Sequence, residues 1–201
     1  RGWDVNFGQK PFKYTVPTGF NAGISTHMLP EPTVTDPSAH FGMLTWDGSG
    51  SAKNETGLAD AGGTAWTPDF VWIKERNDSS DHALFDCLRS NGTRAIRPSN
   101  TTAEDTDATA VTDLISGGVA LGDSSGGSNA TNRSSKTYIA WCMLAGGEPT
   151  ASDTGGASQT GAMATNSVFK GGSNFSFTPA SGAYYPKKMS IAEHRGFSIV
   201  T

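Results

Sequence analysis

Tyr138-Ile139-Ala140-Trp141-Cys142-Met143-Leu144 is the stretch that decides the fold, together with the shorter run Phe70-Val71-Trp72-Ile73. Each is an apolar run without regular polar interruptions. Short apolar runs of about four to eight residues between turn-like segments are typical of strands inside a β-protein. We therefore expect both runs to form central strands that are covered on each face of the sheet.

Similar but weaker patterns recur on both sides of these runs. With the two central strands at 70–75 and 137–144, we expect further short strands at 41–46, 83–88, 93–97, 111–115, 118–122, 167–170, 174–178, 187–192 and 196–201. Gly-rich and Ser-rich loops lie between them. Thr102 to Asp113 begins like a helix cap but has no apolar periodicity, which favours a surface loop or a single turn. Many short strands with such turns predict an all-β sandwich or barrel.

The first 37 residues differ from the rest. Prolines interrupt them every few residues, and proline cannot donate to a sheet ladder. Trp3, Val5 and Phe7 alternate with polar residues, as in a half-buried strand. We therefore expect residues 1–37 to be an extended, Pro-rich segment that contains the end of a preceding domain and a linker.

The composition limits the class of protein. Leu, Ile, Val and Phe make up only 33 of 201 residues, which is below the roughly 20% under which a chain with a high net charge is typically disordered. The net charge of -4 is small, and the apolar residues are clustered, so we expect a folded domain with a thin core that packs against copies of itself. No Lys and Arg cluster suggests nucleic acid as a partner, and no apolar stretch of about 20 residues suggests membrane insertion.

Several motifs occur in an order that resembles a module of phage tail-fibre and virion appendage proteins of the marine-phage type. They are Pro68-Asp69-Phe70-Val71-Trp72-Ile73-Lys74, His82-x-Leu84-Phe85-Asp86-x-x-Arg89, Asn100-x-Thr102-Ala103-Glu104 and Tyr138-Ile139-Ala140-Trp141-Cys142. The opening Val5-Asn6-Phe7-Gly8-Gln9 is similar to the end of a SPRY-like sandwich, which often precedes that module. Gly196 to Thr201 looks like the start of a following unit.

The resemblance implies a lectin-like or jelly-roll antiparallel β-sandwich. It divides the chain into residues 1–37 (end of the SPRY-like domain and linker), 38–195 (the sandwich) and 196–201 (start of the next unit). It also implies a structural and adhesive module of a tail fibre or other virion appendage, located in the extracellular particle. Its expected partners are copies of itself, other virion proteins and a host-surface glycan or protein. A capsid or tail decoration protein and a carbohydrate-binding module are the alternatives.

No residue pattern predicts catalysis, so we expect no enzyme. His82 lies near Asp81 and Asp86, but the Gly-x-Ser-x-Gly elbow that positions a serine nucleophile is missing from the sequence. The acidic stretch from Glu104 to Asp107 does not have the spacing of an EF-hand loop. We therefore predict no catalytic residue, no metal and no cofactor. Carboxylates distant in sequence could still form a polysaccharide-cleaving site.

Two residue types remain as candidates. Among the five Trp, Trp66 stands between glycines and a proline, and is the candidate for stacking on a sugar, although packing is the expected role. Trp72 and Trp141 have apolar neighbours and are expected in the core. Cys87 and Cys142 lie in apolar runs, so they are either two buried thiols or a single disulfide between neighbouring strands.

Overall fold

The computed structural model describes residues 33–106, 109–124, 131–157, 159–193 and 196–201, together with Thr15 and Thr18. The chain divides into two compact units, Arg1–Thr35 and Asp36–Thr201. The strand expected around Trp3 and the SPRY-like end expected within 1–37 lie outside the described residues. In the second unit the regular structure is β, apart from the short 3-10 helix η2 (Pro37–Ala39).

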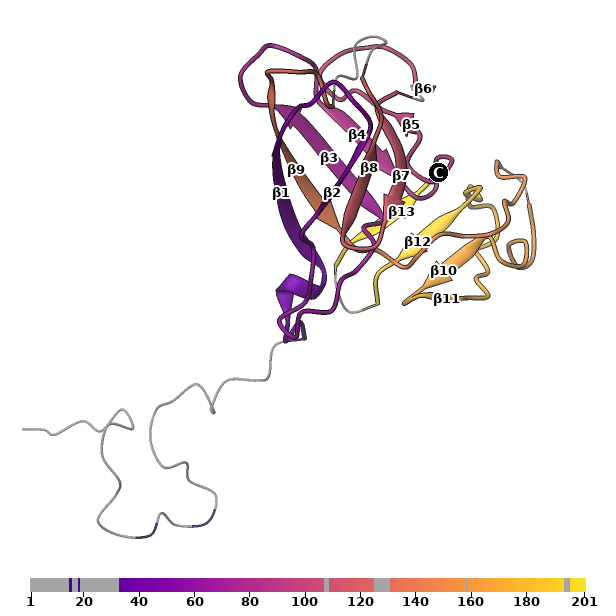
Figure 1. Ribbon diagram of the computed structural model, residues 1–201. Helices are drawn as coiled ribbons and strands as arrows, with labels where there is room; N and C mark the ends of the chain where they lie inside the picture. Colours follow the sequence, from indigo (N-terminus) through magenta and orange to yellow (C-terminus); the bar gives the residue numbers. More distant parts are fainter. Residues whose placement is uncertain are drawn as a thin grey trace, which may run out of the picture. The chain divides into compact units, whose positions relative to one another are not determined.

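Two antiparallel sheets form a sandwich (Figure 1). The large sheet has the order β1-β9-β3-β4, with β1 at Phe41–Asp47, β9 at Thr137–Met143, β3 at Phe70–Glu75 and β4 at Ala83–Asp86. The small sheet has the order β2-β8-β7, with β2 at Lys53–Thr56, β8 at Gly118–Leu121 and β7 at Val111–Ile115. β5 (Arg94–Ala95) and β6 (Asp105–Thr106) pair as a separate two-stranded antiparallel ribbon.

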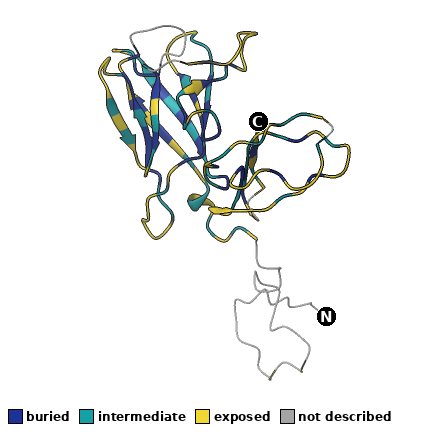
Figure 2. Cartoon of the chain, turned by 90° about the vertical axis from the view of Figure 1, so that its right-hand side faces the viewer, coloured by how far each residue is buried: buried dark blue, intermediate teal, exposed yellow. Residues whose placement is uncertain are grey.

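The core lies between the two sheets (Figure 2). Period-2 alternation in β9 buries Tyr138, Ala140 and Cys142, and the intervening residues point to the other face. Val119 and Leu121 of the small sheet face the same core. This packing of two inner faces confirms the expected all-β antiparallel sandwich and excludes the barrel alternative, because both sheets are open.

A third sheet follows the sandwich. Its order is β11-β10-β12-β13, with β11 at Ser173–Asn174, β10 at Val168–Lys170, β12 at Met189–Ile191 and β13 at Ser198–Val200. We call it the C-terminal sheet. The pair β10 and β12 is parallel, and a small second core around Met163, Val168 and Tyr185 supports this sheet. Residues 196–201, expected to open another unit, therefore supply the last strand of this sheet.

The sequence predicted that both central strands are covered on each face of the sheet, and this prediction is wrong. Outward-facing residues of β9 are only half-buried, and Trp72 in β3 is 36% exposed. Trp72 and Trp141 therefore lie outside the core, which corrects the expectation for both. An antiparallel sheet can leave one face to solvent, and an apolar run does not distinguish this arrangement from burial on two sides.

Candidate functional site

The outer face of the large sheet carries a row of apolar side chains at one register level. Met43 lies opposite Trp141, Trp141 lies opposite Trp72, and Trp72 lies opposite Leu84. Directly opposite residues of antiparallel strands point to the same face of the sheet. The surface that we call the aromatic face consists of Phe41, Met43, Trp72, Leu84, Ile139 and Trp141.

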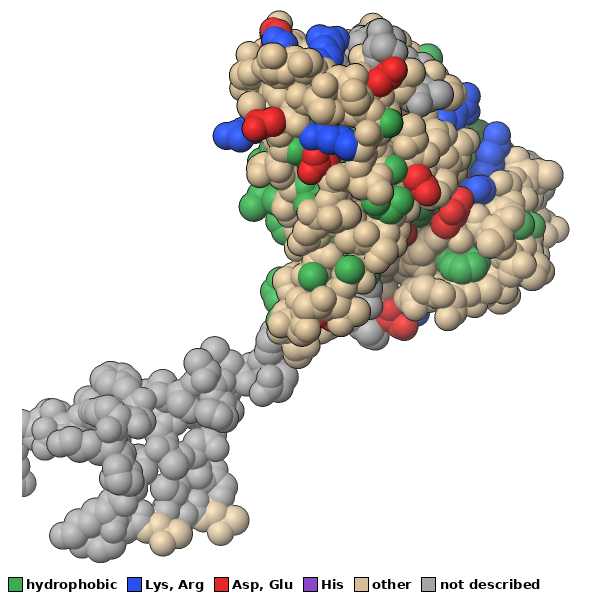
Figure 3. Space-filling view, in the orientation of Figure 1, with side chains coloured by type: hydrophobic (Ala, Val, Ile, Leu, Met, Phe, Trp, Pro, Cys, Tyr) green, Lys and Arg blue, Asp and Glu red, His purple; other side chains and the backbone are tan. Residues whose placement is uncertain are grey.

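The aromatic face is accessible to a partner. Met43 is 58% exposed and Phe41 is 44% exposed, while Ile139 and Trp141 are half-buried. Hydrophobic side chains reach the surface on the side where β1 lies (Figure 3). A contiguous exposed apolar patch on a folded domain marks a site of contact with another molecule.

Trp72 is held in one orientation by its neighbours. Its ring meets Trp141 edge to face with the centroids 5.6 Å apart, and it meets His82 in the same way at 5.5 Å. The indole Nε1 donates a hydrogen bond to His82 Nδ1 at 2.8 Å. The centre of the aromatic face is therefore a preorganised cluster of three rings.

The polar groups beside this cluster are already bonded within the domain. The indole donor of Trp72 is used by His82, and the Lys74 ammonium donates to the carbonyls of Glu75 and Asp78 at 2.6 and 3.1 Å. Sugar recognition needs polar groups that converge on the ligand, besides an aromatic surface. The aromatic face thus suits an apolar protein surface better than it suits a glycan.

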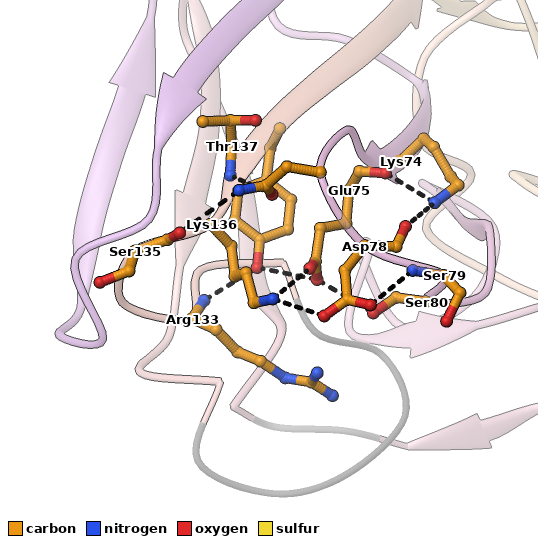
Figure 4. A network of polar contacts seen from close by, with 11 residues as sticks. Lys74, Glu75, Asp78, Ser79, Ser80, Arg133, Ser135, Lys136 and Thr137 are labelled. Atoms are coloured by element: carbon orange, nitrogen blue, oxygen red, sulfur yellow. Dashed lines mark hydrogen bonds and ion pairs between the residues drawn. The ribbon is translucent and has the colours of Figure 1, made fainter.

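A buried polar network fixes the end of the large sheet next to this face (Figure 4). Glu75 is 2% exposed, and its Oε2 accepts hydrogen bonds from Ser80 Oγ at 3.0 Å and from the Tyr138 hydroxyl at 3.3 Å. The Lys136 ammonium lies 3.6 Å from Glu75 Oε1 and also pairs with Asp78. The network joins the end of β3 to the segment before β9.

The network is structural because its charges compensate one another. The hydrogen bond from Lys136 lowers the pKa of the Asp78 carboxyl, and the same bond raises the pKa of Lys136. Burial, together with the nearby Glu75 carboxylate, raises the pKa of Tyr138 to about 12. All of these shifts hold the groups in their paired states, so this cluster stabilises the strand ends.

Trp66, the candidate for sugar stacking, has a packing role in the structure. Its ring is half-buried against the core, and its Nε1 donates to the Ser38 carbonyl at 2.9 Å. The carbonyl of Trp66 accepts from Gly117 N at 3.0 Å. Trp66 therefore fastens η2 to the sandwich and lies away from the row of the aromatic face.

The acidic and histidine candidates are engaged in local contacts. His82 stands immediately before β4 and bonds to Trp72, while the Asp81 carboxylate accepts from Ser99 Oγ at 3.0 Å and from Asn100. Glu104 pairs with both Arg89 and Arg94. Within the described residues, no three His, Cys, Asp or Glu side chains gather as a metal site would require.

Cys87 and Cys142 are free thiols and both are buried, so the structure contains the pair of buried thiols and not the disulfide alternative. Burial raises the pKa of both, that of Cys142 to about 12. A thiol that stays protonated in an apolar environment is a weak nucleophile. Both cysteines act as small core residues.

Comparisons with known proteins give one match. A family described as Domain of unknown function (DUF7483) matches residues 36–184, which include the whole sandwich. No curated protein and no solved structure matches the chain. No helix among the described residues is long and apolar enough to cross a membrane.

Proposed function

The chain belongs to the DUF7483 family, whose function is unknown, and from its own surface we propose that it is a structural and adhesive module of a virion appendage. The module works by assembly and contact, without catalysis. It associates with copies of itself through the aromatic face, and with other virion proteins. The observation that carries this proposal is the apolar row Met43, Trp141 and Trp72 on the outer face of the large sheet, in which Met43 and Trp72 are exposed.

Two physical features support a second copy as the occupant of the aromatic face. None of the six side chains of the aromatic face is charged, and the ammonium of the neighbouring Lys74 is already bonded to carbonyls, so two copies can approach through these residues without repulsion. The domain has few apolar residues for its length. Association between copies would bury apolar surface in addition to the surface that folding already buries. The ordered sequence motifs that resemble appendage modules support the virion location.

Sedimentation velocity of the full chain over a range of concentrations tests the assembly. We expect the wild type to form a concentration-dependent oligomer. Met43→Arg should sediment as a monomer, because it places a charge on the most exposed side chain of the face. The fold should tolerate this change, since Met43 contributes little to the core.

Tyr184→Arg is the matched control, because Tyr184 is 79% exposed and lies outside the aromatic face. It should leave the oligomer intact. A wild type that stays monomeric at every concentration, or an oligomer that persists in Met43→Arg, would overturn assembly through this face.

A further inference from the structure

A second surface lies where the sandwich meets the C-terminal sheet. It is an open groove of about 930 Å³, a volume in the range of ligand sites. One wall comes from the segment around Arg89, Arg94 and Glu104, and the other comes from Tyr184 to Lys188. We call it the tyrosine groove. In Figure 3, Lys and Arg side chains gather on this side of the molecule.

Tyr184 is presented to the groove by strand-like alternation. Its neighbour Tyr185 is 3% exposed, packs in the second core and donates its hydroxyl proton to the Gly161 carbonyl at 2.6 Å. Successive side chains of an extended segment point in opposite directions, so Tyr184 must face outward. It is the most exposed large hydrophobic residue of the described chain, at 79%.

The backbone that carries this wall is fixed on both sides. Gly156 and Tyr185 exchange two backbone hydrogen bonds of 2.8 Å, and Lys187 N donates to the Thr201 carbonyl at 2.6 Å. Gly155 has a positive φ of 68°, and a Cβ there would lie 2.8 Å from Lys187 Cγ. Gly155 thus allows the loop to approach the wall closely, and the groove is preorganised.

The groove is cationic in a chain of net charge -4. Arg89, Arg94, Lys187 and Lys188 line it, and Glu104 is the one acidic side chain in the lining. Glu104 pairs with both arginines, which orients their guanidinium groups. Among the described residues, no carboxylate forms an ion pair with Lys187 or Lys188. Lys188 is nevertheless close enough to act on Glu148, where it opposes the effect of burial, which raises the pKa of that carboxyl.

The exposed ring of Tyr184 lies in the same groove as two lysines that form no ion pair among the described residues, and as Arg94, which Glu104 orients. This combination is suited to one class of ligand. We propose that the tyrosine groove binds an acidic polysaccharide that carries carboxylates, such as a uronic-acid polymer. The apolar face of a sugar ring lies on Tyr184, and the sugar carboxylate is held by Lys187 and Arg94. This inference names a ligand for the adhesive part of the proposed function, and it does not depend on the aromatic face.

Isothermal titration with polygalacturonate, neutral dextran, dextran sulfate and a single-stranded DNA oligonucleotide tests the ligand class. The full chain should bind polygalacturonate, more weakly at higher salt, and should not bind dextran. Equal binding of dextran would show that charge is not recognised. Preference for dextran sulfate or DNA over polygalacturonate would overturn the carboxylated sugar as the ligand.

Variants locate the site. Tyr184→Ala and Lys187→Ala should each weaken polygalacturonate binding about tenfold or more, because each removes one of the proposed contacts. Tyr184→Phe should retain most of the affinity, since it keeps the ring. Phe175→Ala, an exposed aromatic outside the groove lining, is the matched control and should bind like the wild type.

Unchanged affinity in both Tyr184→Ala and Lys187→Ala would overturn the groove as the site. Met43→Arg distinguishes the groove proposal from the assembly proposal, because this variant keeps the tyrosine groove intact and should not assemble. If Met43→Arg binds short oligogalacturonate as well as the wild type, the groove acts independently of assembly. Loss of this binding in Met43→Arg would contradict an independent groove.

Discussion

Tyr138 connects a buried charge to a partly buried backbone group. Its hydroxyl donates to Glu75 Oε2 and accepts from the Arg133 backbone N–H at 3.0 Å, and the residue is fully buried. A hydrogen bond to a charged group contributes more than a bond between neutral groups. The stability of the strand ends should therefore be sensitive to this single oxygen.

Tyr138→Phe should lower the free energy of unfolding by about 2 kcal/mol, because it leaves the Glu75 carboxylate and the Arg133 N–H each without one partner. The matched control is Tyr185→Phe, which removes the hydroxyl of another buried tyrosine, one that donates to a neutral carbonyl, and should cost about 1 kcal/mol. Urea denaturation with a constant m-value measures both. A loss at position 185 equal to that at 138 would contradict the role assigned to the charge.

The same residue predicts a pH dependence. The pKa of Tyr138 is raised from 10.0 to about 12 in the folded chain, so the folded state favours the neutral phenol. A raised pKa contributes stability that is complete below pH 10 and is lost as the pH rises toward 12. Tyr138→Phe should reduce the loss of stability in that pH window, which urea denaturation at pH 8 and pH 11 would detect.

At the scale of elements, the side chain of Asn132 forms hydrogen bonds that connect three segments of the sandwich. It is fully buried, donates to the carbonyls of Ser51 and Gly122 at 2.6 and 2.8 Å, and accepts from Ser49 N at 2.9 Å. The loop after β1, the end of β8 and the segment before β9 thereby meet at one side chain.

Asn132→Ala should cost about 3 kcal/mol, since three hydrogen bonds of about 1 kcal/mol each are lost and the carbonyl of the buried Gly122 loses this partner. Asn77→Ala is the control, because Asn77 accepts from Thr137 N at the exposed surface and water can replace its carbonyl oxygen. Thermal unfolding of both variants checks the difference. Equal transition temperatures would contradict the role of Asn132 as a tie between loops.

The elements show how far the sequence predicts this fold. The pattern of short apolar runs located β1, β3, β7, β8 and β9 to within a residue or two, because each of these strands has a buried face. It missed β2, where Lys-Asn-Glu-Thr has no apolar residue and forms an edge strand through backbone pairing with β8. It also gave no sign of the parallel pair β10 and β12, which depends on tertiary packing.

The candidate surfaces were less predictable than the strands. Met43, Trp72, Leu84 and Trp141 become neighbours only through strand register, which single runs do not encode. The run did not indicate that Trp72 faces outward, because apolar residues lie on both faces of β3 and the charged Glu75 lies on the buried face. The tyrosine groove combines segments about a hundred residues apart, and no local pattern marks it.

For the whole molecule, the two proposed surfaces should act together. An oligomer formed through the aromatic face presents several tyrosine grooves to one polymer, and linked sites bind with a higher overall affinity than a single site. The wild type should therefore dissociate from a polygalacturonate-coated surface at least tenfold more slowly than Met43→Arg.

Surface plasmon resonance measures these dissociation rates at concentrations where the wild type is oligomeric. Affinity for short oligogalacturonate in solution, which occupies one groove, should be the same for both proteins, since Met43 is not part of the groove lining. Tyr184→Ala, which keeps the aromatic face, should form the oligomer but not be retained on the surface. Equal dissociation of wild type and Met43→Arg from the coated surface would mean that assembly does not contribute to adhesion, even where each surface functions alone.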